Sequence, residues 1–284
     1  MTYSRNEAKI PPTRAFLWIF LWTLAISGSA WLGWFYYVHL RGSRSHDPQY
    51  NIEAIVQSHP QKEGLKTVYL AELLKLSLDN PTNLYDFDIE EGRRSLLGMP
   101  LIKEASIKRI RPGTLFIQYD VRVPIAFLGD YSNTALDDEG ILFPFNPFFT
   151  PKRLPTLILG FEQVKTGWGE SLKDDPKMRL AFEVLKAFFD GSATTPFFTH
   201  RIDVSKAFDD SEGQRQIVVS LKEQFDAHLI TYHLRLHPDF YLEGVQHFLT
   251  LREHLIEKNL YHDSKELIID LRLPHLAFLK GERS

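Results

Sequence analysis

Histidines are the first side chains in this sequence whose type and spacing could support chemistry. His228, His233 and His237 lie close together in "HLITYHLRLH", and imidazole is a common ligand of zinc. Residues 228 and 233 are separated by an odd number of positions, so a β-strand places them on opposite faces. His247 and His254 fall on a predicted helix without the HExxH spacing of a zinc site. The spacing therefore favours structural or surface histidines over a metal site.

Two acidic clusters, each directly before a glycine, could supply a pair of catalytic carboxylates. They are Asp137, Asp138 and Glu139 before Gly140, and Asp209, Asp210 and Glu212 before Gly213. Aspartate and glycine also build turns, and the turn interpretation is favoured. A single cleft holding Asp138 and Asp210 would instead favour a membrane-anchored hydrolase.

Other catalytic signatures are missing from the sequence. It has no cysteine, which excludes disulfides and a catalytic thiol. It also has no Walker loop and no GxSxG or GxGxxG motif. The formal net charge of −3 argues against nucleic acid as a partner. We therefore predict no catalytic, metal-binding or cofactor-binding residue, and a protein that is not an enzyme.

The longest uncharged segment is "AFLWIFLWTLAISGSAWLGWFYYV", Ala15 to Val38. A helix of this length crosses the roughly 30 Å hydrocarbon core of a bilayer. Tryptophan and tyrosine gather towards both ends, as they do at membrane interfaces. We predict a transmembrane helix over residues 15–38. The preceding leader, residues 1–14, contains Arg5, Lys9 and Arg14, which favours a cytoplasmic N-terminus.

A cleaved signal peptide is the alternative interpretation of this segment. "ISGSA" ends in small residues that could form a cleavage site. Cleavage would release an exported binding protein. The apolar run continues through Trp34 and Phe35, which favours a retained anchor.

The chain beyond the anchor divides by pattern into a linker and two domains. Residues 39–48 are polar and rich in small residues, as in linkers. Residues 49–123 show the order strand, helix, helix, strand, strand, which predicts a compact α+β domain. Residues 124–284 predict short strands with two helices, near residues 174–191 and 241–260. The predicted fold class is α+β, with a mixed β-rich second domain.

The hairpin that closes the first domain carries a basic cluster. "IKEASIKRIRPGTLFIQYDVRVPIAFL", Ile102 to Leu128, has two alternating runs around a Pro-Gly turn. Its cations are Lys103, Lys108, Arg109 and Arg111. They could bind acidic lipid or a protein partner. They could also be the solvated face of an edge strand, where charge discourages unwanted pairing.

Several stretches, taken in order, resemble the FtsQ/DivIB family of bacterial cell-division proteins. "LLGMPLIKEASIKRIRPGTLFIQYDVRVPIAFL" is similar to the end of that family's POTRA domain, including its "R-x-P-I-A" motif. "LDDEGILFPF" resembles its "D-x-x-G-x-x-F" element, and "LPTLILG" its "L-P-x-hydrophobic-x-G" element. "IIDLRLPHLAFL" resembles its closing strand pair. These stretches run from about Tyr50 to Lys280.

The resemblance implies a non-catalytic scaffold in the inner membrane, with a POTRA-type domain and a β domain outside the cytoplasm. It implies partners of the FtsB/FtsL type and an indirect link to FtsW/FtsI-type septal peptidoglycan synthases. The family's recruitment surface falls on Ile107 and Arg109. Its partner-binding edge falls on Arg272 and Leu273, with Phe248 on the preceding helix. The family often has an aromatic residue after "D-L-R". In this sequence the position is Leu273, and the Pro274 that follows removes a backbone donor.

One further class of protein has the same types of domain but no role in cell division. A membrane-anchored, POTRA-containing assembly or secretion factor would usually carry several POTRA repeats or a C-terminal barrel, and neither pattern is visible in the sequence.

Overall fold

The structure, a computed structural model, describes residues 12–61, 63–77, 79–161, 167–188, 196–225, 228–258 and 264–283. The chain forms two compact units. The first contains the described parts of residues 1–58, 66–96 and 106–118, and the second contains those of 59–65, 97–105 and 119–284. Most of the predicted leader, residues 1–11, lies outside the described residues.

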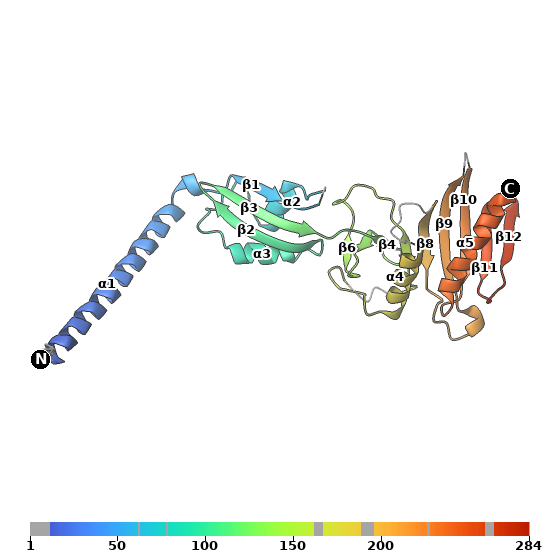
Figure 1. Cartoon of the computed structure of the whole chain (residues 1–284). Coiled ribbons are helices and arrows are strands. Elements are labelled where there is room, and N and C mark those ends of the chain that lie inside the picture. The colour runs from blue at the N-terminus through green and yellow to red at the C-terminus, as the bar shows by residue number, and fades with distance from the viewer. Residues whose placement is uncertain are drawn as a thin grey trace, which may run out of the picture. The chain divides into compact units, whose positions relative to one another are not determined.

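The first element is the long helix α1, Pro12–Ser45 (Figure 1). Its part from Phe16 to Ser45 is long and apolar enough to cross a membrane, with a mean hydropathy of 1.5 over the most apolar window. The tryptophans and phenylalanines of this part are exposed. Residues 39–45, expected to belong to a linker, continue the helix. Pro48 then begins the short 3₁₀ helix η1, Pro48–Tyr50.

A three-stranded sheet with two helices follows α1. Its elements are β1 Ala54–Ser58, α2 Thr67–Leu73, α3 Ile89–Leu97, β2 Ile102–Ile110 and β3 Thr114–Val121. The strand order is β1-β3-β2, with β1 parallel to the central strand β3. The predicted order of strands and helices is therefore present.

Local sequence signals explain these elements. The Asp88 carboxylate accepts hydrogen bonds from the N–H groups of Glu90 and Glu91 at 2.8 and 3.1 Å, and so caps α3. Alternate residues of β3, including Leu115 and Ile117, are buried. This is the period-two pattern of a sheet with one face in the core.

The second unit is built on a nine-stranded mixed sheet in the order β12-β11-β10-β9-β8-β7-β4-β5-β6. Its strands are β4 Ala126–Leu128, β5 Thr134–Leu136, β6 Leu142–Pro144, β7 Thr156–Ile158, β8 Phe197–Asp203, β9 Ile217–Phe225, β10 His228–Leu236, β11 Ser264–Leu271 and β12 Phe278–Arg283. A second 3₁₀ helix, η2 Glu212–Gln214, precedes β9. The α+β class and the β-rich second part are thus confirmed.

Two helices contribute to the core of this sheet. They are α4, Pro176–Phe188, and α5, Tyr241–Glu257, which contact one another. Met178 and Val184 of α4 and Phe248 of α5 join one cluster of buried residues with side chains from the strands. The apolar stripes of both helices therefore face the sheet.

Candidate partner-binding surface

The two edges of the nine-stranded sheet differ in how their backbone groups are satisfied. At the β6 edge, Leu142 N–H donates to the Glu170 carbonyl at 3.1 Å, and Gly169 N–H donates to the Leu142 carbonyl at 2.7 Å. A bridge between Ile141 and Ser171 extends this cover. In the part of the chain that the structure describes, no strand pairs with the outer side of β12. β12 is therefore the open edge.

Large apolar side chains lie along this open edge. Leu273 and Leu276 are in the turn between β11 and β12, and Phe278 and Leu279 begin β12. Their exposed fractions run from 48% for Leu279 to 58% for Phe278. Exposed apolar groups beside unpaired backbone groups are what a partner strand would cover.

Arg272 is held tightly in place next to these residues. Its guanidinium donates to both carboxylate oxygens of Asp270, with Nη2–Oδ2 2.7 Å and Nε–Oδ1 3.0 Å. It also donates to the Gly213 carbonyl at 3.2 Å. Arg272 thus fastens the end of β11 to the turn before β9. Only the solvent-facing part of the Arg272 side chain could therefore contact a partner, as predicted from the sequence.

Arg272 lowers the pKa of the Asp270 carboxyl. Partial burial alone would raise its pKa, but the hydrogen bonds from the Arg272 side chain and backbone N–H outweigh burial and hold the pKa below the ordinary value. The same side-chain hydrogen bond raises the pKa of Arg272. The pair therefore stays ionised at neutral pH.

A cavity of about 400 Å³ opens beside the pair. It is lined by Glu212, Gly213, Arg215, His237, Asp270, Arg272, Leu273 and Phe278. One wall is charged and another is apolar. The cavity gives the open edge a pocket in which one side chain of a bound segment could lie.

Phe248, predicted as a weaker partner contact, does not reach the surface. Its side chain is fully buried, with ring centroids 5.4 Å from Tyr232 and 5.9 Å from Phe197. Direct contact with a partner does not fit this position. The reason is visible in the helix itself, since Phe248 lies on the apolar stripe of α5 that packs on the sheet.

The two residues predicted for recruitment lie on β2 and differ in exposure. Ile107 is buried and lies near Gly92 of α3, so it belongs to the core of the first unit. Arg109 is exposed, and its guanidinium donates to the Phe87 carbonyl at 2.6 Å. Of the two, only Arg109 presents its side chain to solvent.

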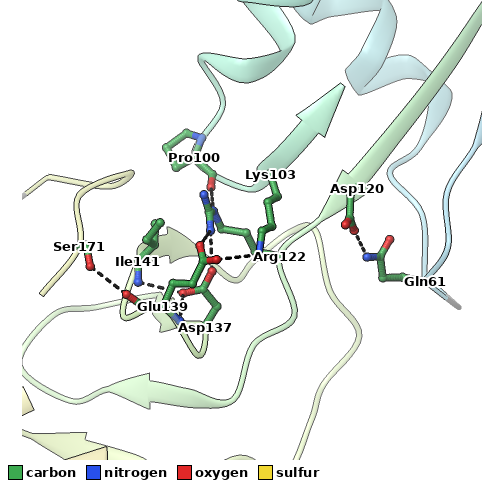
Figure 2. A network of polar contacts seen from close by, with 9 residues as sticks. All are labelled: Gln61, Pro100, Lys103, Asp120, Arg122, Asp137, Glu139, Ile141 and Ser171. Carbon is green, nitrogen blue, oxygen red and sulfur yellow. Dashed lines mark hydrogen bonds and ion pairs between the residues drawn. The ribbon is translucent and has the colours of Figure 1, made fainter. Parts of the chain in front are cut away.

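Figure 2 shows a network that the sequence did not reveal. Arg122 Nη1 lies 2.6 Å from Asp137 Oδ2 and 3.2 Å from Glu139 Oε2. Lys103 Nζ lies 2.8 Å from Glu139 Oε1. Lys103, expected to belong to a basic patch, is thus paired. These residues all belong to the second unit, where they fasten the ends of β2 and β3 to the β5–β6 turn.

The acidic clusters have structural roles in this arrangement. Asp137 Oδ1 accepts from the N–H groups of Glu139 and Ile141, which builds the β5–β6 turn. The Asp209–Gly213 turn lies between β8 and β9, which β7 and β4 separate from β5. Among the described residues, no group of three or more His, Asp or Glu side chains is arranged to hold a metal ion.

Comparison with known proteins gives no assignment. No protein-family model matches the chain. No curated protein matches it either.

Proposed function

We propose that this chain is a single-pass membrane scaffold of the FtsQ/DivIB kind, which binds coiled-coil division proteins of the FtsB/FtsL type. Through them it acts on septal peptidoglycan synthesis by FtsW/FtsI-type synthases. In this proposal α1 crosses the inner membrane with the N-terminus in the cytoplasm. The three-stranded sheet with α2 and α3 serves as a POTRA-type domain, and this sheet and the nine-stranded sheet lie outside the cytoplasm.

The open edge at β12 is the observation that carries the proposal. A partner strand added there would satisfy the outer N–H and C=O groups of β12. Leu273, Phe278 and Leu279 would give the added strand an apolar surface. Pro274 lies in the turn, outside β12, so it removes no donor from residues 278–283. The covered edge at β6 makes β12 the end of the sheet that fits this role.

Site-specific photocrosslinking in living cells tests the proposal. A crosslinking amino acid is placed at Leu273, Leu276, Phe278 or Leu279, and the captured protein is identified by mass spectrometry. Val68 on α2 and Trp168, next to the residues that cover β6, are matched controls, because both are exposed apolar residues away from β12.

We expect a division protein of the coiled-coil type to be captured from the edge positions and not from Val68 or Trp168. Equal capture from all positions would show a non-specific surface. A division-competent protein that captures nothing from the edge would contradict the proposal.

A further inference from the structure

The C-terminal end of α1 is bonded to the segment between α2 and α3. The side-chain amide of Asn83, which is nearly buried, donates to the carbonyls of Arg44 and Asp47 at 3.1 and 3.2 Å. The Arg44 guanidinium lies 5.7 Å from the centre of the Tyr85 ring. Tyr85 in turn packs edge-on against Tyr50, with ring centroids 5.2 Å apart. Asn83 and Tyr85 therefore hold the segment between α2 and α3 against the C-terminal end of α1.

The β2–β3 turn lies next to the segment that leaves this helix end. The Gly113 carbonyl accepts from Glu53 N–H at 2.9 Å and from Ala54 N–H at 3.3 Å. A Cβ atom at Gly113 would collide with the Asn51 carbonyl oxygen, so the two backbones are in close contact. Figure 1 shows this turn at the end of the three-stranded sheet that adjoins α1. Residues 110–113 therefore lie close to the point where the chain leaves α1.

The helix geometry gives the distance between the C-terminal end of α1 and the hydrocarbon core of the bilayer. The uncharged segment ends at Val38, and Arg44 lies six residues later, about 9 Å further along the helix axis. The headgroup layer on each side of the hydrocarbon core is about 5–8 Å thick. The end of α1 and the adjoining turn therefore lie at the headgroup boundary when α1 spans a bilayer.

The turn carries the side chains that an acidic membrane surface attracts. Lys108, Ile110, Arg111 and Pro112 are all exposed, and Ile110 is 46% exposed. Among the described residues, neither Lys108 nor Arg111 forms an ion pair. Arg109, by contrast, is bonded to the Phe87 carbonyl. Cations flanking an exposed aliphatic side chain are typical of interfacial segments.

We propose that the β2–β3 turn binds the anionic headgroups of the bilayer that α1 crosses. Lys108 and Arg111 would supply the charge, and Ile110 would insert at the boundary. This contact adds to the anchor without replacing it. The proposal rests on the membrane-spanning half of the proposed function and is independent of the division partners.

Depth-dependent quenching in the full-length protein tests this contact. The native sequence has no cysteine, so Ile110→Cys can carry a single fluorescent label. The protein is placed in nanodiscs of phosphatidylcholine alone, or of phosphatidylcholine with phosphatidylglycerol, each with spin-labelled lipid as quencher. A label at Leu24→Cys in α1 reports insertion of the anchor, and one at Val68→Cys reports an exposed site on α2.

We expect quenching at position 110 in the acidic nanodiscs and much less in the neutral ones. Each cation near an acidic surface contributes about fivefold to such an equilibrium, so Lys108→Gln with Arg111→Gln should reduce the contact roughly 25-fold. About 1 M salt should have a similar effect. Arg93→Gln with Arg94→Gln on α3 removes the same charge elsewhere in the unit and should leave the quenching unchanged.

Quenching at position 24 without quenching at position 110 would overturn the headgroup contact alone. Equal quenching at position 110 in both lipid compositions would also overturn it, because proximity would then need no anionic lipid. Loss of quenching at position 24 would refute the anchor, and with it the membrane half of the proposed function.

Discussion

Arg122 and Asp137 form an ion pair with an Nη1–Oδ2 distance of 2.6 Å, although they are 15 residues apart in the chain. Their side chains are 12% and 3% exposed. Arg122 belongs to the "R-x-P-I-A" stretch and Asp137 begins the "D-x-x-G" stretch. The two stretches are separate in the sequence but are joined by this ion pair, which holds the end of β3 to the β5–β6 turn.

Removing the cation of this pair is expected to destabilise the second unit. Arg122→Met leaves Asp137 buried without its counter-charge, which should lower the free energy of unfolding by about 3 kcal/mol. Urea unfolding of the full chain in detergent micelles, followed by circular dichroism, measures the change. Lys103→Met removes the exposed partner of Glu139 in the same network and should have little effect. An equal loss in both variants would contradict this distinction.

The Asp270–Arg272 pair predicts an acid-dependent contribution to stability. Because the folded-state pKa of Asp270 is lowered, its contribution is present above the ordinary value of 3.8 and is lost as the pH falls through the lower folded value. Asp270→Asn should therefore melt below the native protein at pH 6, and the difference should shrink as the pH falls from 3.8 through the lowered folded-state pKa of Asp270. Asp210→Asn is the exposed control. A constant difference in melting temperature across this range would contradict the linkage.

A charge at the open edge is expected to weaken partner binding without unfolding the protein. Leu273 is exposed, so Leu273→Glu should leave the melting temperature nearly unchanged. Its contact with an apolar partner surface would be lost, with an expected tenfold or greater decrease in affinity, roughly the effect of losing one interface contact. Arg272→Glu should also weaken binding, but it breaks the pair with Asp270 and should lower the melting temperature as well. A pull-down showing undiminished binding by a folded variant would remove this edge from the proposal.

Phe248 provides the contrast between a core residue and a surface residue. Phe248→Ala should lower the free energy of unfolding by about 3–5 kcal/mol, because it opens a cavity between α5 and the sheet. Any loss of partner binding should then follow the fraction of unfolded protein. Binding lost by a variant of native stability would instead indicate a direct contact, against its complete burial.

The exposed cation Arg109 predicts an effect on recruitment. Arg109→Glu removes the bond to the Phe87 carbonyl and reverses the charge on β2, so we expect a weaker midcell signal from a fluorescent fusion. Ser106→Glu adds one negative charge at another exposed position of the same strand and serves as the control. Normal midcell recruitment of a folded Arg109→Glu variant would count against this surface.

The elements of the fold follow largely from local pattern. The cap at Asp88, the alternation of Leu115 and Ile117, and the apolar stripe of α5 each depend on neighbours within a few residues. The same stripe predicts burial of Phe248, whereas the family resemblance places Phe248 at a partner contact. Local pattern therefore predicts elements and their buried faces better than it predicts partner contacts.

Long-range pairing could not be predicted in the same way. Nothing in the sequence distinguishes the paired Lys103 from Lys108, which forms no ion pair with a described residue. The difference comes from Glu139, 36 residues away from Lys103. The strand order of the nine-stranded sheet likewise depends on contacts between distant segments. Which edge stays open is decided by residues 169–171, which cover β6.

Hydrogen–deuterium exchange of the β12 backbone tests the central claim most directly. The measurement compares the amides of residues 278–283 in the full-length protein alone and in complex with the division protein captured by crosslinking. Strand addition predicts that the outward N–H groups of β12 become protected while the amides of β6 keep their exchange rates. A bound partner that leaves the exchange of β12 unchanged would contradict the claim.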